Sequence, residues 1–168
     1  MQLQNLNDVF VEQLADLYSA EQQLVKALPK VASAASEPEL EEAITEHLEQ
    51  TRGHVRRLEK VFQELSITPP SETCEAMKGL IAEGEEIIQA SGDPVARDVA
   101  LIGAAQRVEH YEMAGYGTAR QLAKQLDFDK AADLLGDTLD EESEADKKLT
   151  KLATGGMTSA GVNERAMR

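Results

Sequence analysis

Three glutamates and a threonine stand in the middle of apolar stripes in four helical segments. Counted at about 100° per residue, Glu21, Glu112 and Glu142 each point in the same direction as nearby apolar side chains, and Thr51 does so in the remaining segment. A lone buried glutamate is costly, and three converging carboxylates repel one another. A divalent cation offsets both costs because it supplies positive charge and accepts several oxygen ligands. The pattern therefore predicts a carboxylate metal site in a helical core.

Four further metal-ligating side chains flank these positions along the helices: Glu109, Asp146, His47 and His54. Bundles with two metal ions take one Glu from each of two helices and Glu-x-x-His from each of the other two. Here the two Glu-x-x-His positions contain Thr51-x-x-His54 and Glu142-x-x-Ala145. One has lost its glutamate and the other its histidine, so the predicted site is either rebuilt or degenerate.

Each of these side chains also has a role that needs no metal. Glu21 and Glu112 could pair in the core with an arginine or a water molecule, and Glu142 could join a polar network with Thr51. The two histidines could be satisfied core residues, and Asp146 could pair with a lysine. The sequence leaves both interpretations open.

Five helical segments must position these residues. Apolar periodicity predicts long helices over 7–34, 39–65, 94–126 and 129–153, with a shorter one over 73–90. Breaks fall at Pro38, Pro69-Pro70, Pro94 and Asp127. Two helical hairpins joined by a long link indicate an all-α, ferritin-like four-helix bundle whose single crossover contains the short fifth helix. We expect one bundle domain over residues 1–154 and a flexible tail over 155–168.

The two hairpins also align with each other at an offset of 91 residues. Glu21 then falls on Glu112, and Leu48 falls on Leu139. Few identities survive, but the offset superimposes the apolar stripes together with a mid-stripe glutamate. Two related hairpins around a pseudo-twofold axis would produce this pattern.

Composition limits the partners. The chain has 17 Lys and Arg against 31 Asp and Glu, a formal net charge of -14. A protein this acidic repels phosphate backbones and anionic lipid. We therefore expect no nucleic-acid or membrane partner. The N-terminus lacks the pattern of a signal peptide, and the single Cys74 excludes an internal disulfide. We expect a cytoplasmic, soluble protein with an unreactive thiol.

Several motifs in order resemble the YciE/YciF family of ferritin-like bacterial proteins. They cover residues 17–24, 47–51, 74–81, 104–112 and 139–142, and the resemblance extends over about residues 5 to 153. It implies a cytoplasmic homodimer induced under stress. More distant ferritin-like relatives such as rubrerythrins also carry Glu-x-x-Glu on the third long helix, which matches Glu109 and Glu112. The chain departs from their Glu-x-x-His pattern, so their peroxidase or ferroxidase activity is not carried over.

Three functions remain open at this stage. The first is a stress-response protein that binds one or two metal ions, iron or manganese, in the bundle core. The second is an iron or manganese oxidoreductase that acts on peroxide or ferrous iron and needs an open coordination position. The third is a structural or interaction dimer whose buried acids pair internally.

Overall fold

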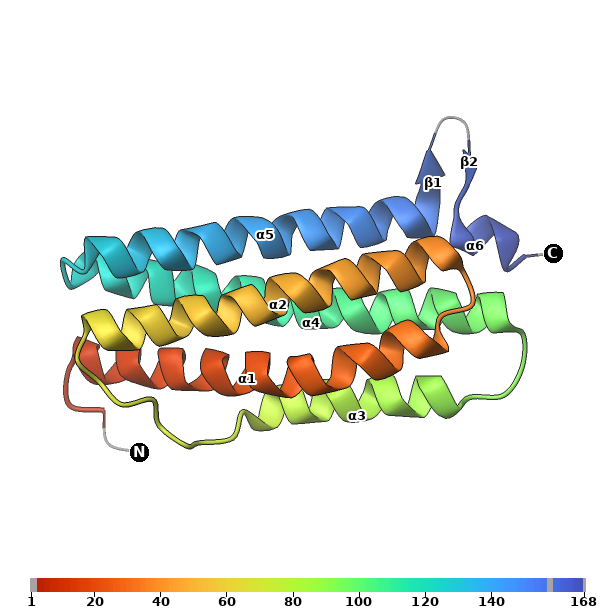
Figure 1. The fold of residues 1–168 in the computed structure, drawn as a ribbon. Coiled ribbons are helices and arrows are strands. Elements are labelled where there is room, and N and C mark those ends of the chain that lie inside the picture. Colours follow the sequence, from red (N-terminus) through yellow and green to blue (C-terminus); the bar gives the residue numbers. More distant parts are fainter. Residues whose placement is uncertain (1–2, 157–158, 168) are drawn as a thin grey trace.

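The computed structural model describes residues 3–156 and 159–167 of the chain. Four long helices run side by side as an elongated bundle, and a shorter helix lies along one flank (Figure 1). The elements are α1 (Leu6–Ala34), α2 (Pro38–Glu64), α3 (Glu75–Gln89), α4 (Pro94–Gln125), α5 (Asp129–Thr154), β1 (Gly155–Gly156), β2 (Ser159–Ala160) and α6 (Val162–Arg165). The predicted ranges 1–154 and 155–168 include residues 1, 2, 157, 158 and 168, which lie outside the described residues.

The predicted all-α bundle with a helix-containing crossover is confirmed, and every predicted helix end lies within two residues of the observed one. Helix α1 packs against α2 and α4, while α5 packs against α4 and α2. The crossover helix α3 packs mainly against α1 and α4. Each long helix therefore turns one face toward a common axis.

The helices begin where the sequence supplies caps. The Asn5 side chain accepts a hydrogen bond from the Asp8 backbone N–H (3.0 Å), and Asp93 accepts one from Ala96 (2.8 Å). Prolines occupy the first turns of α2 and α4, where no backbone N–H is required. Local caps and prolines thus mark the starts of α1, α2 and α4.

One buried acid ties the two hairpins together. Asp98 of α4 is fully buried, and its carboxylate accepts hydrogen bonds from the Ser36 backbone N–H (3.0 Å), the Ser36 hydroxyl (2.7 Å) and the Glu37 backbone N–H (2.7 Å). These donors lie at the start of α2, where the helix leaves its N–H groups unpaired. Asp98 therefore caps α2 from a different helix.

After α5, the structure describes residues 155–156 and 159–167, which belong to the range for which we expected a flexible tail. Strands β1 and β2 pair antiparallel, and α6 packs against α4 and α5. Val162 is only 1% exposed, and Arg165 forms an ion pair with Glu37 (3.1 Å). Because Val162 fills the end of the core, this short segment is held against the bundle despite its polar composition.

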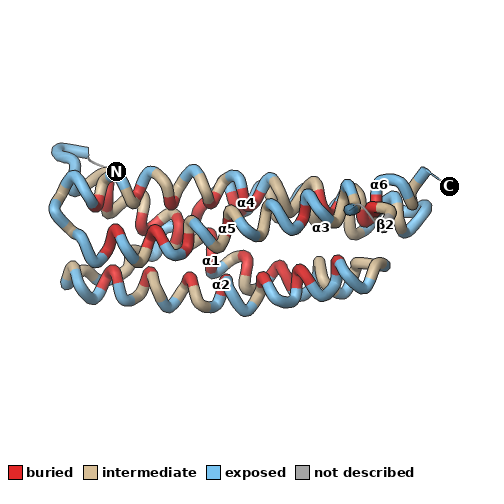
Figure 2. The backbone as a smooth tube through the Cα atoms, turned by 90° about the horizontal axis from the view of Figure 1, so that it is seen from above, coloured by how far each residue is buried: buried red, intermediate tan, exposed pale blue. Residues whose placement is uncertain are grey.

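The apolar core consists of two clusters along the bundle, and buried residues follow the inward faces of the long helices (Figure 2). One cluster includes Phe10, Phe62 and Leu135, and the other includes Leu28, Leu40 and Leu101. Several fully buried polar side chains of the same four helices belong to neither cluster. In the part of the chain that the structure describes, none of the helices combines the length and the apolar character that crossing a bilayer requires.

Replacing Asp98 by Ala should lower the free energy of unfolding by about 3 kcal/mol, because it leaves buried N–H donors of α2 without an acceptor. Asp93→Ala is the matched control, since it removes one exposed cap and should lower the free energy by about 1 kcal/mol. Urea denaturation measures both values. Equal losses for the two variants would show that Asp98 is an ordinary cap.

Candidate metal centre

A layer of buried polar side chains crosses the bundle, with contributions from all four long helices. Its members are at most 5% exposed: Glu21, His47, Thr51, His54, Glu109, Glu112 and Glu142. Six of the seven sequence-predicted ligands belong to this layer, and Thr51 is the mid-stripe threonine. In the described residues, the layer contains no lysine or arginine.

The first group of side chains consists of Glu21 from α1, His54 from α2 and Glu142 from α5. Their ligand atoms all lie within 4.8 Å of one another. His54 Nδ1 lies 3.2 Å from Glu21 Oε1 and 2.9 Å from Glu142 Oε1. One imidazole nitrogen and two carboxylates thus face a common point.

The second group consists of His47, Glu109, Glu112 and again Glu142, also with ligand atoms within 4.8 Å of one another. His47 Nε2 lies 3.4 Å from Glu109 Oε1 and 3.8 Å from Glu142 Oε2. Glu142 belongs to both groups. The two groups are therefore adjacent, with one carboxylate between them.

Most of these ligand atoms come close together without forming hydrogen bonds. Among the described residues, both oxygens of Glu112 and Glu142 lack a hydrogen-bond partner, as do one oxygen each of Glu21 and Glu109. The same holds for His54 Nδ1 and both ring nitrogens of His47. Buried polar atoms are normally paired, so a cluster of this kind requires an explanation. Ligands arranged around a cation would have these unpaired atoms.

His54 is held from outside the layer. Its Nε2 lies 2.8 Å from Glu141 Oε2 in a hydrogen bond, and Glu141 in turn accepts two hydrogen bonds from Arg57 (2.7 and 2.6 Å). In the neutral imidazole, an N–H at Nε2 would leave the lone pair of Nδ1 on the side of Glu21 and Glu142, available to a metal ion. Metal-binding histidines are commonly oriented by a carboxylate in this way.

Two hydroxyl groups complete the surroundings. The buried Tyr116 hydroxyl donates a hydrogen bond to Glu21 Oε1, which leaves Glu21 Oε2 free. The Thr51 hydroxyl donates to the backbone carbonyl of His47 in its own helix (2.8 Å). The Thr51 hydroxyl is thus hydrogen-bonded within its own helix. At this position the bundle pattern has a glutamate, and Thr51 offers no carboxylate in its place.

Burial dominates the electrostatics of the acids. Desolvation, together with the neighbouring carboxylates, raises the pKa of Glu109 and of Glu112 well above the usual value. Desolvation also raises the pKa of Glu21, against the opposing attraction of His54. Without a cation, Glu109 and Glu112 therefore tend to hold protons.

The histidines behave differently from each other. Burial lowers the pKa of His47, because a charged imidazolium in the core lacks the hydration that it would have in water. Burial has the same effect on His54, but the adjacent Glu142 and Glu21 more than reverse it and raise its pKa to about 10. For Glu142, burial is outweighed by His54 and His47, and its pKa falls. His54 and Glu142 thus form the charged pair of the metal-free layer.

Asp146, the seventh predicted ligand, lies in neither group. Its Oδ1 accepts a hydrogen bond from Gln106 Nε2 (3.0 Å) and lies 3.3 Å from Nε2 of the exposed His110. Cys74 is buried and lies 3.1 Å from the Tyr111 hydroxyl, and burial raises the pKa of its thiol. The thiol is thus shielded and protonated, as an unreactive cysteine would be.

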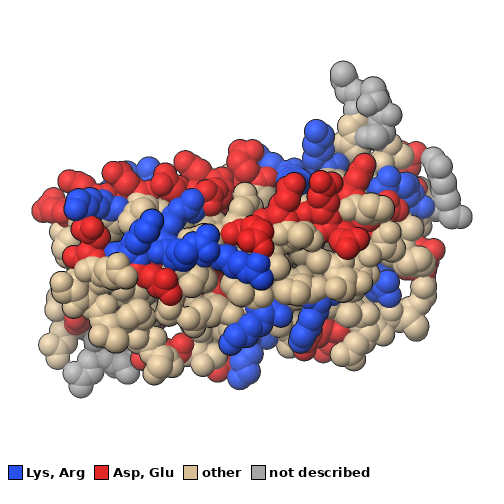
Figure 3. Space-filling model, in the orientation of Figure 1, with Lys and Arg blue, Asp and Glu red and all other residues tan. Residues whose placement is uncertain are grey.

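A polar cavity of about 100 Å³ leads to the second group from between α2 and α5. His47 and Glu109 lie at its inner wall, and Glu46, Glu144 and Lys148 also line it. Lys148 and Glu46 form an ion pair there. Acidic side chains also follow the upper edge of the molecule over α5 (Figure 3). A cation could reach the layer by this polar route.

Sequence reasoning did not identify Glu141 or Tyr116 as part of the site. Tyr116 lies four residues after Glu112 on the same helical face, which was the available signal. No such signal pointed to Glu141, because Glu142 faces the core and the helical residue just before a core-facing one normally does not.

Comparisons with known proteins place the geometry in context. Residues 5–166 match a family described as "Domain of unknown function (DUF892)". The chain is 45% identical over 165 residues to Protein YciF of Escherichia coli (strain K12), across 98% of this chain and 99% of that protein.

Two solved structures share the fold. The crystal structure of the E. coli stress protein YciF has a TM-score of 0.87 and 47% identity, and covers 89% of this chain and 95% of its own. YcfI from Rhodopseudomonas palustris has a TM-score of 0.87 and 39% identity, and covers 90% of this chain and 97% of its own.

Tyr116→Phe should lower the free energy of unfolding of metal-free protein by about 1–3 kcal/mol, because a fully buried carboxylate loses its donor. Tyr18→Phe is the matched control. Its hydroxyl donates to Glu59 (3.1 Å) at a half-buried position, so its loss should lower the free energy by less than about 1 kcal/mol. If urea denaturation gave the same value for both variants, Tyr116 would have no special link to the layer.

Proposed function

This chain belongs to the DUF892 family, and we propose that it is a metal-binding stress protein whose bundle core holds two divalent ions on either side of Glu142. The stress role rests on the relative described as a stress protein. The metal role rests on the chain's own residues. We further propose that it acts in the cytoplasm as a homodimer.

The observation that carries the proposal is the set of buried ligand atoms without hydrogen-bond partners, gathered in two groups that share Glu142. An internal network would pair these atoms with one another, because unpaired buried polar groups are costly. The ion-pair contacts of His54 and His47 with the neighbouring acids (2.9 to 3.8 Å) still leave both oxygens of Glu112, and one oxygen each of Glu21 and Glu109, without a hydrogen-bond partner among the described residues. The residues therefore fit a pair of cations better than they fit a self-contained polar network.

Each group supplies a suitable set of donors. Glu21, His54 and Glu142 would hold one ion, and His47, Glu109 and Glu112 would hold the other together with Glu142. Carboxylate and imidazole ligands suit iron and manganese, and bound iron or manganese would supply one-electron redox chemistry. The chain's own contribution is to hold the ligands: Glu141 orients His54, and Tyr116 positions Glu21.

A second function, oxidoreduction of peroxide or ferrous iron, is favoured by the small number of protein ligands. The first group contains three residues, and Thr51 and Ala145 stand where the bundle pattern would add a Glu and a His. Fewer protein ligands leave coordination positions for a substrate. This activity would use the same residues as metal binding.

Protein purified without chelator or histidine tag and loaded with manganese should contain two ions per chain, one for each ligand group. Glu21→Ala should retain one ion, because it disrupts only the first group. Glu142→Ala should bind both ions at less than full occupancy, because the carboxylate that the two groups share is lost. Elemental analysis of the desalted proteins measures these ratios.

Glu49→Ala is the control for a general loss of charge, since Glu49 is 66% exposed on α2 and pairs with Arg52. It should leave the metal content unchanged. Equal metal loss from Glu21→Ala and Glu49→Ala, or no bound metal in the unaltered protein, would contradict the proposal.

A further inference from the structure

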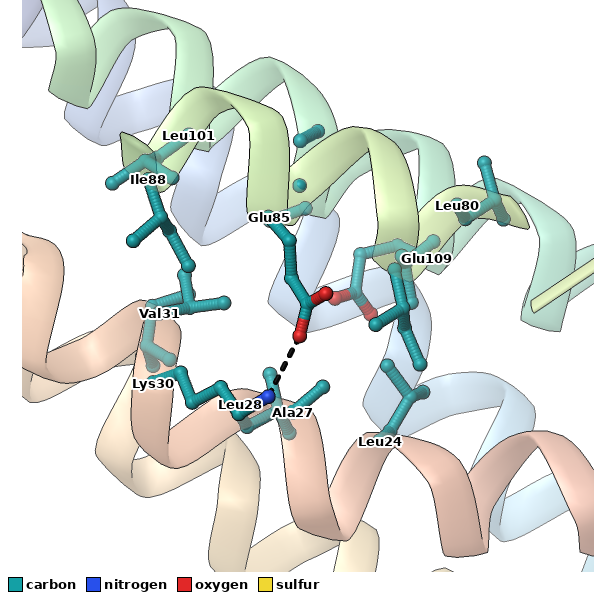
Figure 4. Close-up of a pocket in the computed structure, with 16 residues that line it drawn as sticks. Leu24, Ala27, Leu28, Lys30, Val31, Leu80, Glu85, Ile88, Leu101 and Glu109 are labelled. Atoms are coloured by element: carbon teal, nitrogen blue, oxygen red, sulfur yellow. Dashed lines mark hydrogen bonds and ion pairs between the residues drawn. The ribbon is translucent and has the colours of Figure 1, made fainter. Parts of the chain in front are cut away.

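A second cavity, apolar and about 50 Å³ in volume, lies between α1, α3 and α4. Leu24, Leu28, Ile88 and Leu101 are among the side chains that line it (Figure 4). The crossover helix lines this cavity, whereas α5 lines the polar cavity; Ile44 of α2 lines both. Glu109 lines both cavities.

Gly84 of α3 lines the cavity without a side chain. The inward stripe of this helix runs through Leu80, Gly84 and Ile88 at intervals of one turn. A large apolar residue would be expected at the central position. A Cβ built on Gly84 meets no atom within 4 Å, so the space beside it is open. Gly84 therefore leaves open space on the cavity side of α3.

A buried carboxyl group gives the apolar cavity a polar inner end. Glu109 is 2% exposed and its Oε2 has no hydrogen-bond partner among the described residues. Figure 4 shows this carboxyl among the apolar side chains of α1 and α3. The ion pair between Lys30 and Glu85 (2.7 Å) joins α1 to α3 at the solvent side, where the two side chains are 63% and 44% exposed.

We propose that this cavity binds a small neutral aliphatic molecule with a terminal hydroxyl-type group, the alkyl chain along the apolar wall and the polar end at Glu109. The wall favours a short alkyl chain, and the unpaired Glu109 oxygen supplies one hydrogen bond to the head. An anionic head is disfavoured, because it would lose its hydration in the apolar cavity and because Lys30, the cation among the lining residues, is already paired with Glu85. The volume is roughly a third of that of an apolar cavity that binds benzene, which limits the enclosed part of the ligand to a few atoms.

The proposal goes beyond metal binding and does not require it, because Glu109 lines the cavity in the metal-free protein as well. The test therefore uses full-length, metal-free protein with labelled Leu, Ile and Val methyl groups, titrated with 1-butanol and observed by NMR. Saturable shifts should be confined to the methyl groups around the cavity, including those of Leu24, Ile88 and Leu101. Butyrate, with the same chain length and an anionic head, should produce no saturable shift at these positions.

Gly84→Leu should fill the cavity and weaken butanol binding at least about tenfold, while the protein stays folded because leucine favours a helix more than glycine does. Gly79→Leu makes the same change on the same helix at an exposed position outside the cavity, and it should bind butanol as the unaltered protein does. Absence of saturable shifts in the unaltered protein would overturn the proposal. So would butanol binding that survives Gly84→Leu, or butyrate binding as tight as that of butanol. None of these outcomes depends on the metal content.

Discussion

Four glutamates cannot all carry charge in one buried layer without a compensating positive charge, and this constraint organises the structure. Among the described residues of the layer, His54 is the only cation, because burial lowers the pKa of His47. The acids therefore either hold protons, as the raised pKa values of Glu109 and Glu112 indicate, or surround a cation. Because the acids are buried, an ionised state without a compensating cation is costly.

The two hairpins contribute different side chains to the buried layer. At the offset of 91 residues, Glu21 corresponds to Glu112, and Thr51 corresponds to Glu142. Glu142 faces both ligand groups, whereas Thr51 turns its hydroxyl to its own helix backbone. His54 of α2 has no counterpart in α5, where Ala145 stands. A pseudo-symmetric scaffold thus carries ligand groups that differ in composition, which would give two bound ions different surroundings.

The fold could be predicted closely because local signals coincide with its boundaries: prolines, caps and helical periodicity all agree. The direction of Glu21, Glu112 and Glu142 followed from helix geometry alone. Asp146 shows the limit of that reasoning, because a position one turn from Glu142 lies far enough around α5 to pair with Gln106. Contacts between helices such as Asp98 with Ser36, or Glu141 with His54, depend on how the helices pack, and no local pattern encodes them.

The melting temperature of metal-free protein, measured with and without added manganese, iron or zinc, tests the central claim most directly. Binding to the folded state alone should stabilise it by roughly 2.7 kcal/mol when free metal exceeds Kd a hundredfold. The Glu112→Gln variant should gain less from metal, while its metal-free stability should hold or rise as repulsion is relieved. If none of the three metals shifted the melting temperature and Glu112→Gln destabilised the metal-free protein, the buried acids would be an internal network and the metal-binding account would be wrong.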